Sequence, residues 1–499
     1  MLPLDAIATL RARLLDTDYT LDAVLDRLGE AGRRGLERNS TTPARDALNA
    51  ADPDDAQAAL ARLWILQDAV GAASVRRALG DAAGPLASAG LLAPGPGDTV
   101  RATAVVRPYG AEATASTPAV AGWICHDPLP NLDGHAGAPR PDHVLGISPA
   151  STTLAQLSIR RPVASALDLG TGCGVQSLHL AAHAERIVAT DLNPRALDLA
   201  RITTGLSCVD ADLRLGSLYD PVAADSFDLI VCNPPFVISP PTDARLTYRE
   251  GDLPGDELVR RVLVEGAGKL NPQGTMQVLC NWAIVDGEPW DERLADWLRP
   301  TGCDALVLQR ERLDPYEYAE IWLADAGLDA GAGHQRRYRE WLDYLGALRI
   351  TGVGMGWVSL RNAGRATPDL RLEDWPFDVH QPVGDALAAQ QRAVDLAAVT
   401  EATLLATRWR LAPGVVQETL GRPGAEDPEH IVLRQSQGLG RATEAGTAVA
   451  ALVGACEGDL AASEIIVALA SLLEVDTDAL TAELTPRLRD LVLDGYLTA

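Results

Sequence analysis

Apolar residues recur at the spacing of an amphipathic helix in the first part of the chain. The segments LDAVLDRLGEAGRRGL (21–36) and ALARLWILQDAV (59–70) place Leu, Val, Ile and Trp three or four positions apart, with charged residues between them. This spacing gathers the apolar side chains on one face of a helix. We therefore predict a helical region from residue 1 to about residue 95.

The pattern changes towards the end of this region. SVRRALGDAAGPLASAGLL (74–92) predicts a helix and a short second helix ending at glycine, and TVRATAVVRPYG (99–110) has the pattern of a strand. This order of elements resembles a winged-helix module. A further strand, GWICHDP (122–128), precedes a Gly/Pro-rich stretch at 131–143, which predicts a loop.

From about residue 144 to 362, short apolar runs alternate with helical segments. This alternation is typical of an α/β fold, in which helices cover both faces of a parallel sheet. The segment 313–349 predicts a helical insertion before the last strand. We predict seven strands, at 165–170, 186–191, 212–217, 227–233, 274–282, 304–311 and 351–360.

The chain is expected to be helical again after about residue 366. LAASEIIVALASLLEV (460–475) and PRLRDLVLDGYLTA (486–499) resemble the second and third helices of a winged helix. We expect three domains: a helical domain with a winged-helix-like end and a strand pair (1–143), the α/β domain (144–365) and a helical, winged-helix-like domain (366–499).

The composition excludes several classes of protein. The 499 residues are 47% hydrophobic, which is typical of globular domains. No run approaches the ~20 apolar residues of a membrane helix. Asp5, Arg11 and Arg13 interrupt the segment in which a signal peptide needs an apolar run, so we expect a cytoplasmic protein without a membrane span. The seven cysteines include no CxxC pair, which argues against a disulfide framework or a zinc site.

The net charge of -25 bears on the partner. A protein that grips duplex phosphates usually presents a broad basic field, and this charge opposes one. The basic clusters at 33–38 and 334–339 are most simply solvated helix faces. His179 and His183 have a spacing that suits a metal, but no third ligand accompanies them, and we predict no metal site.

A glycine-rich loop follows the first strand of the α/β domain. In ALDLGTGCGVQSLHLA (166–181), Asp168 precedes three glycines and an amphipathic helix. Glycines suit such a turn because they adopt backbone angles that side chains disfavour and let a ligand approach the main chain. Asp191 ends the next strand, where it can accept hydrogen bonds from ribose hydroxyls. A dinucleotide fold shares these features, but here Val175 replaces the third glycine of the GxGxxG fingerprint. The three glycines are Gly170, Gly172 and Gly174.

A second loop ends the strand in FDLIVCNPPFVISP (227–240). An amide or exocyclic amino nitrogen is a poor nucleophile because its lone pair is delocalised. The side-chain oxygen of Asn233 and the carbonyl of Pro234 can accept its two hydrogens and favour a localised lone pair. Pro234 and Pro235 stiffen the loop, and Phe236 would stack on a planar acceptor. The loop therefore predicts chemistry at a planar nitrogen.

The two loops resemble those of the class I S-adenosylmethionine-dependent methyltransferases of the small-domain group. The resemblance covers roughly residues 144–290 and implies a Rossmann-like sheet of seven strands with S-adenosylmethionine as the cofactor. It also implies that Gly170 and Gly172 lie against the methionyl part of that cofactor. The motifs that carry it are DLGTGCG (168–174), ATDLNPRAL (189–197) and NPPF (233–236).

The same resemblance implies further cofactor contacts. Asp168 would lie beneath the amino group, Asp191 on the ribose, and the two residues after Asp191 beside the adenine. In GSLYD (216–220), Ser217 and Leu218 stand where the family usually has Asp-Leu, so the adenine contact departs from the family pattern. The cofactor-binding residues implied in this way are Ser151, Asp168, Gly170, Thr171, Gly172, Gly174, Asp191, Leu192, Asn193, Ser217 and Leu218.

The catalytic loop does not by itself identify the methyl acceptor, because the Asn-Pro-Pro-aromatic sequence occurs in three groups. These are the RNA guanine-N2, the adenine-N6 and the release-factor glutamine methyltransferases. The helical N-terminal region and the acidity favour the glutamine group. That group usually has Ile-Pro-Arg-Pro before the first strand and Tyr in the loop, whereas GISPASTT (146–153) keeps only Pro149 and Ser151 of that segment, and the aromatic is Phe236. NPPF and an appended domain favour RNA.

We therefore predict N-methylation of a nucleobase in RNA. The alternatives are a protein glutamine, a small molecule, and a non-catalytic protein that binds S-adenosylmethionine. The intact NPPF sequence argues against the last of these.

Overall fold

The computed structural model describes residues 1–49, 51–52, 54–114, 117–129, 132–134, 140–242, 246–251, 253–328, 333–422 and 429–499. Of the loop predicted at 131–143, residues 131 and 135–139 lie outside this set. The chain forms two compact units. One comprises Met1–Ala155 and Arg160–Trp375, and the other comprises Gln156–Ile159 and Pro376–Ala499.

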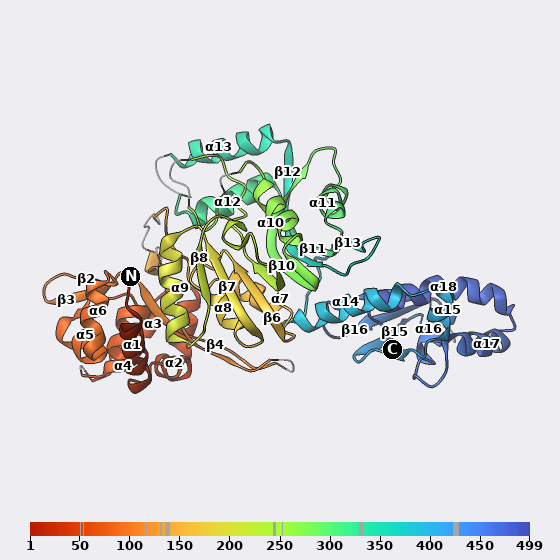
Figure 1. Cartoon of the computed structure of the whole chain (residues 1–499), viewed down its shortest axis with the longest axis horizontal. Coiled ribbons are helices and arrows are strands. Elements are labelled where there is room, and N and C mark those ends of the chain that lie inside the picture. The colour runs from red at the N-terminus through yellow and green to blue at the C-terminus, as the bar shows by residue number, and fades with distance from the viewer. Residues whose placement is uncertain are drawn as a thin grey trace. The chain divides into compact units, whose positions relative to one another are not determined.

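An eight-stranded sheet forms the centre of the first unit (Figure 1). Its order is β13-β11-β12-β10-β9-β6-β7-β8, and it is mostly parallel, with β12 antiparallel to both of its neighbours. The seven predicted strands and the α/β fold class are confirmed. The strands are β6 Val163–Leu169, β7 Ala184–Asp191, β8 Asp212–Leu215, β9 Phe227–Cys232, β10 Leu270–Val285, β11 Asp304–Leu313, β12 Ile350–Arg361 and β13 Leu370–Asp374.

Strand β13 is absent from the prediction, which places helix after residue 366. It pairs parallel to β11, with Leu370 opposite Ala305. Arg371 and Glu373 on this strand form an ion pair. A short strand that carries charges is a common way to protect the edge of a sheet. The sheet therefore continues past the expected domain boundary at 365.

The order of the strands determines where a ligand can bind. The chain builds the sheet outwards in opposite directions from β6, because β7 lies on one side of it and β9 on the other. In such sheets ligands bind in the crevice at the carboxyl ends of the strands, at the point where the order reverses. The glycine loop follows β6 and the Asn-Pro-Pro-Phe loop follows β9, so both lie at this point.

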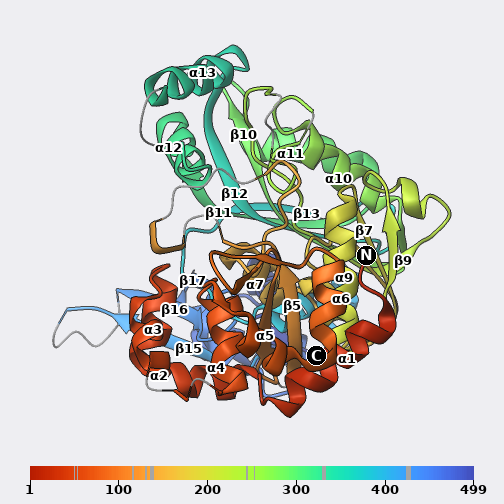
Figure 2. The same cartoon turned by 90° about the vertical axis from the view of Figure 1, so that its left-hand side faces the viewer.

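Helices cover the sheet and bury its apolar side chains. Residues of α8 and α9 belong to one apolar cluster, and residues of α10 and α11 belong to another. The predicted insertion is helical and consists of α12 and α13, which lie next to each other and to β12 (Figure 2); residues 329–332 between them are outside the described set. The bounds are α8 Val175–Leu180, α9 Pro194–Leu206, α10 Glu257–Ala267, α11 Trp290–Leu298, α12 Pro315–Asp325 and α13 His334–Ala347.

The N-terminal part of the first unit is helical, as predicted, and packs on α9. One apolar cluster joins Leu10 and Trp64 of this part to Leu199 and Ile202 of α9. Strand β5 Val120–His126, which pairs with β4 Val105–Ala111, also contacts α9. The helices are α1 Leu4–Asp16, α2 Leu21–Glu37, α3 Thr42–Asn49, α4 Ala56–Leu60, α5 Ala72–Leu79 and α6 Ala83–Ser88.

Three short strands accompany α5 and α6. They are β1 Val70–Gly71, β2 Leu92–Pro94 and β3 Thr99–Ala102, and they form an antiparallel sheet in the order β1-β3-β2. The predicted order of helix, short helix and strand is present. That these elements form a winged-helix module stays a prediction.

The second unit contains strands as well as helices. The prediction of a helical, winged-helix-like segment after residue 366 named the helices but did not place these strands. The physical reason is that β15 is almost wholly exposed and lacks the apolar alternation of a half-buried strand. Its strands are β14 Arg410–Leu411, β15 Val415–Leu420, β16 His430–Gln435, β17 Ala442–Ala445 and β18 Leu497–Thr498.

The helices of the second unit enclose their own apolar cluster around the buried Trp409. The predicted helical segments at 460–475 and 486–499 correspond to α17 and α18, and their winged-helix identity stays a prediction. The helices are α14 Gly384–Ala397, α15 Glu401–Ala406, α16 Thr447–Gly454, α17 Ala462–Leu473 and α18 Thr477–Leu493. Among the described residues of both units, no helix combines the length and the apolar character needed to span a membrane.

Candidate active site

A cavity lies at the carboxyl ends of β6, β7 and β9. It brings the glycine loop, the acid at the end of β7 and the Asn-Pro-Pro loop together. Every predicted site residue lines it except Gly172, Gly174 and Phe236. The lining residues among those predicted are Ser151, Asp168, Gly170, Thr171, Asp191, Leu192, Asn193, Ser217, Leu218, Asn233, Pro234 and Pro235.

Asp168 lies at the base of the glycine loop and is only 1% exposed. Its Oδ2 accepts hydrogen bonds from the Thr171 hydroxyl at 2.6 Å and from the Ser177 hydroxyl at 2.7 Å. Burial raises the pKa of Asp168 to about 6, although the two hydroxyl donors oppose the rise. A carboxyl group in this state is readily ionised by a cation placed beside it.

The glycines hold the loop in a left-handed conformation. The φ angles are +73° at Gly170 and +55° at Gly172, and a Cβ atom added at either position would meet open space. The positive φ is therefore what requires glycine there. Gly174 has the same requirement, because its φ is +85°, and an added Cβ would also touch Ala200 of α9 at 3.4 Å.

Asp191 joins the glycine loop to the start of α9. Its Oδ2 accepts a hydrogen bond from the main-chain N–H of Gly172 at 2.9 Å, and its Oδ1 accepts one from Asn193 at 2.8 Å. Burial raises the pKa of Asp191, and these main-chain donors lower it. A carboxylate offers about four lone-pair positions. Both oxygens therefore keep the capacity to accept a further hydrogen, as a ribose diol would require.

The residues after Asp191 form the outer end of the cavity. Leu192 is 56% exposed, so it presents an apolar surface at the rim. The side chain of Asn193 caps α9 by accepting from Arg195 N, and it donates to the carbonyl of Asp142. Its amide is thus engaged in holding the backbone. Ser217 and Leu218 line the same cavity.

Ser151 lies in the first turn of α7 Pro149–Leu157. Its hydroxyl accepts a hydrogen bond from Ser148 N and donates one to the Ser148 carbonyl, each at 2.9 Å. The carbonyl of Ser151 accepts from the side chain of Gln176 at 2.7 Å. These bonds fix the start of α7 against α8 at the edge of the cavity.

Asn233 contributes the most distinctive polar atom of the site. Its side-chain oxygen is buried and accepts no hydrogen bond from any residue that the structure describes. An unpaired buried amide oxygen costs about 1–3 kcal/mol. Such a cost is expected where a protein keeps an acceptor ready for the hydrogens of a ligand. Pro234 and Pro235 continue the wall of the cavity beside it.

Phe236 lies against the inserted helix α12. Its ring is in an edge contact with Trp322, with 6.1 Å between the ring centres. On the same helix, the Tyr318 hydroxyl accepts a hydrogen bond from Ile238 N at 2.8 Å and another from the side chain of Asn281 at 2.7 Å. The insertion therefore fastens the loop that carries Asn233.

Two segments without a recognisable motif also line the cavity. They are 143–146, before α7, and 247–251, of which Thr247, Tyr248, Glu250 and Gly251 contact it. The second segment lies beside the Asn-Pro-Pro-Phe loop, because Glu250 forms β-bridges with Phe236 and Val237. The predictions missed both segments, and the sequence carries no periodic signal for either.

The comparisons with known proteins agree with this geometry. Residues 146–284 match the family model described as "Methyltransferase small domain". Residues 16–103 match a model described as a domain of unknown function (DUF7059).

Three relatives illustrate the similarity. A ribosomal RNA small subunit methyltransferase C of Idiomarina loihiensis is 32% identical over 146 residues, which are 29% of this chain and 39% of the relative. A release factor glutamine methyltransferase of Deinococcus radiodurans is 37% identical over 123 residues, 22% of this chain and 43% of the relative. A Methanocaldococcus jannaschii protein named as a protein N5-glutamine methyltransferase is 30% identical over 159 residues. The matched residues are 30% of this chain and 76% of the relative. The chain thus spans less than half the length of the first two relatives.

Proposed function

We propose that this chain, which belongs to the class I methyltransferases of the small-domain group, is a methyltransferase that acts on nitrogen. It would transfer the methyl group of S-adenosylmethionine to a planar amino or amide nitrogen, and the acceptor that we favour is RNA. The observation that carries this proposal is the unpaired side-chain oxygen of Asn233 in the cavity that also contains Asp168 and Asp191. The Asn233 oxygen, which can accept a hydrogen bond from an amino group, thus lies in the same cavity as two carboxyl groups that suit a cofactor.

The residues around the glycine loop and the end of β7 fit this cofactor. S-adenosylmethionine, when bound, supplies a methyl group on a positively charged sulfur. We assign its amino group to Asp168, whose buried carboxyl would be ionised by that cation, and its ribose to Asp191, whose oxygens can accept two more hydrogens. The open space at Gly170 and Gly172 would let the cofactor approach the main chain.

The remaining cofactor contacts are assigned from their place on the cavity wall. Leu192, with the backbone that Asn193 fixes, would border the adenine together with Ser217 and Leu218. Thr171 would act through Asp168, and Ser151 would close the cavity at the start of α7. Gly172 and Gly174 would shape the loop.

The part of the cavity beside Asn233 and Pro234 would hold the acceptor. The Asn233 oxygen and the Pro234 carbonyl would accept the two hydrogens of the reacting nitrogen and turn its lone pair towards the methyl group. The structure of this loop is stiff, because two consecutive prolines fix its backbone and α12 holds the residues that follow it. Preorganisation of this kind lowers the barrier for the transfer step.

RNA is the acceptor that we favour, and protein glutamine is the alternative. Phe236 in the loop and the ribosomal RNA methyltransferase relative support RNA. The glutamine methyltransferase relatives and the net charge of -25 support a protein, since a protein acceptor needs no basic grip on phosphates. A small molecule is a further alternative. A non-catalytic S-adenosylmethionine-binding protein would not need the intact Asn-Pro-Pro-Phe loop.

We assign the catalytic domain to residues 144–375, since β13 extends its sheet past the predicted boundary at 365, and propose that the modules at 1–143 and 376–499 serve acceptor binding. The proposed function is tested by incubating the protein with methyl-labelled S-adenosylmethionine and cell lysate, which is then separated into RNA, DNA, protein and small molecules. Label in RNA is the expected result. Label in protein would favour glutamine, and cofactor binding without label in any fraction would reject catalysis.

A further inference from the structure

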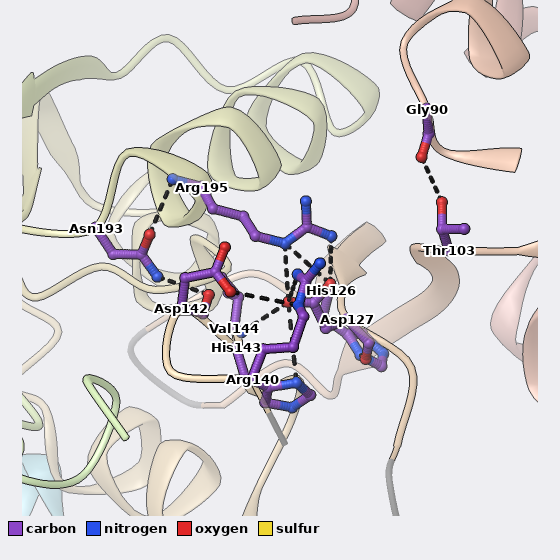
Figure 3. Close-up of polar contacts among 10 residues, drawn as sticks. All are labelled: Gly90, Thr103, His126, Asp127, Arg140, Asp142, His143, Val144, Asn193 and Arg195. Carbon is purple, nitrogen blue, oxygen red and sulfur yellow. Dashed lines mark hydrogen bonds and ion pairs between the residues drawn. The ribbon is translucent and has the colours of Figure 1, made fainter. Parts of the chain in front are cut away.

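A buried carboxyl group outside the cavity lies at the centre of a network of polar contacts (Figure 3). Asp127 follows β5, and its side chain is 3% exposed. Its two oxygens accept hydrogen bonds from Arg195 Nε at 3.1 and 3.0 Å, and Arg195 Nη2 donates a further bond. Arg195 belongs to the first turn of α9, three residues after Leu192. The contact therefore joins the N-terminal strand pair to the segment that borders the cofactor half of the cavity.

The same carboxyl group holds a stretch of backbone that we call the linking segment, residues 140–146. Val144 N donates to Asp127 Oδ2 at 2.9 Å, and Asp127 N donates to the Val144 carbonyl at 3.1 Å. The Asn193 side chain donates to the carbonyl of Asp142. At Gly146 the chain passes so close to His126 that an added Cβ would lie 2.7 Å from its ring. The linking segment is thus held on the cofactor side by several independent contacts.

On its other side the linking segment contacts the loop beside the catalytic loop. Thr247 N donates to the carbonyl of Pro141 at 3.1 Å, and the rings of His143 and Tyr248 are 5.8 Å apart. Thr247 and Tyr248 line the cavity, and Glu250 after them forms a β-bridge with Phe236 of the Asn-Pro-Pro-Phe loop. His143 to Gly146 themselves line the cavity. The linking segment therefore contacts both Asn193, beside Asp191, and the residues next to the Asn-Pro-Pro-Phe loop.

We propose that Asp127 is a positioning residue. It holds the linking segment between Asn193 and residues 246–251, so that cofactor binding stabilises the conformation of residues 246–251. The proposal rests on the proposed function, because it assumes that the cofactor occupies the half beside Asp191 and Asn193. The charge-assisted bonds from two nitrogens of one guanidinium fix both the distance and the angle between the start of α9 and the residue that follows β5. Coupling between two sites is reciprocal, so acceptor binding would in turn strengthen cofactor binding.

The test compares Asp127→Asn with a matched control, Asp225→Asn. In Asp127→Asn the side-chain oxygen can still accept a hydrogen bond from Val144 N, but the negative charge that holds Arg195 is lost. Asp225 is also a carboxylate between two arginines, Arg186 and Arg214, but it does not line the cavity. The measurements are the dissociation constant of S-adenosylhomocysteine by calorimetry and hydrogen exchange of residues 140–146 and 246–251 with and without that ligand.

We expect S-adenosylhomocysteine to slow exchange in both segments of the parent protein and of Asp225→Asn. In Asp127→Asn the dissociation constant should rise by about tenfold, within the usual range of coupling between sites, and the ligand should no longer protect residues 246–251. Parental affinity and parental protection in Asp127→Asn would overturn the proposal. Failure of the parent to bind S-adenosylhomocysteine would instead reject the proposed function.

A second variant covers the case in which Asp127→Asn fails to fold. Arg195→Lys keeps the positive charge beside Asp127 but loses the two-pronged contact. It should fold, reduce the protection of residues 246–251, and weaken S-adenosylhomocysteine binding less than Asp127→Asn does. Parental protection of residues 246–251 in Arg195→Lys would contradict the coupling role.

Discussion

The main-chain N–H of Gly172 donates a 2.9 Å hydrogen bond to Oδ2 of Asp191, so the glycine loop and the acid that ends β7 form one unit. The bond orients the carboxylate and leaves each of its oxygens able to accept another hydrogen. A substitution at Asp191 should therefore disturb both the ligand contacts and the loop.

Asp191→Ala should weaken S-adenosylmethionine binding by roughly 100-fold or more. Two hydrogen bonds to a charged group are lost, each worth ~1.5–3 kcal/mol. Calorimetry measures the change, and Asp212→Ala is the control, because Asp212 is an exposed acid of the neighbouring strand that pairs with Arg214. An affinity for Asp191→Ala like that of the control would reject the ribose assignment.

Cofactor affinity should depend on pH through Asp168. Burial raises the pKa of this carboxyl to about 6, so at pH 5 it is mostly protonated and at pH 7 it is mostly ionised. A cationic amino group binds the ionised form better, and the affinity should therefore rise about tenfold from pH 5 to pH 7 and then level off. Asp168→Asn should bind more weakly at pH 7 and lose this dependence. A flat profile for the parent between pH 5 and 7 would place the amino group elsewhere.

Tyr318→Phe should loosen the catalytic loop while sparing the cofactor. The change leaves two buried donors, Ile238 N and the Asn281 side chain, without their acceptor, at a cost of about 1–3 kcal/mol each. We expect a lower midpoint in urea unfolding, a lower rate of transfer and an unchanged affinity for S-adenosylmethionine. Tyr316→Phe on the exposed side of the same helix should change none of these. Equal rates in the two variants would mean that α12 does not hold the loop.

Phe236 can be tested for stacking separately from packing. Phe236→Leu keeps an apolar side chain against Trp322 but removes the planar ring, whereas Phe236→Tyr keeps the ring. If the ring stacks on the acceptor, Phe236→Leu should raise the KM for the acceptor, and Phe236→Tyr should leave it close to the parental value. Parental kinetics in Phe236→Leu would show that the residue only packs against α12.

The strands and the two motif loops could be predicted because their signals are local. Buried parallel strands appear as apolar runs, and the glycine loop and Asn-Pro-Pro-Phe follow such runs directly. Strand β13 has no comparable signal, since its LRLED sequence reflects its place at the edge beside β11. Strand β15 could not be predicted either, because it is almost wholly exposed and its sequence lacks the alternation of a half-buried strand.

The rest of the site depends on contacts between distant parts of the chain. Residues 143–146 reach the cavity because Asp127 binds Val144, and residues 247–251 reach it because Glu250 pairs with Phe236. The edge contact of Phe236 with Trp322 likewise depends on how the inserted helix folds back. No period or motif in the sequence encodes such contacts, so only the folded chain reveals them.

In the proposed reaction the Asn233 oxygen accepts a hydrogen of the acceptor nitrogen. The decisive measurement is the rate of methyl transfer by Asn233→Ala to the lysate fraction that the parent labels, together with its affinity for S-adenosylmethionine. Loss of one preorganised acceptor typically costs ~10²- to 10³-fold in rate, so transfer should fall by that factor while cofactor affinity stays close to that of the parent. Asn233→Asp, which can still accept a hydrogen bond, should retain more activity than Asn233→Ala. A rate for Asn233→Ala within about tenfold of the parent would contradict the account, because the proposed loss is far larger than that.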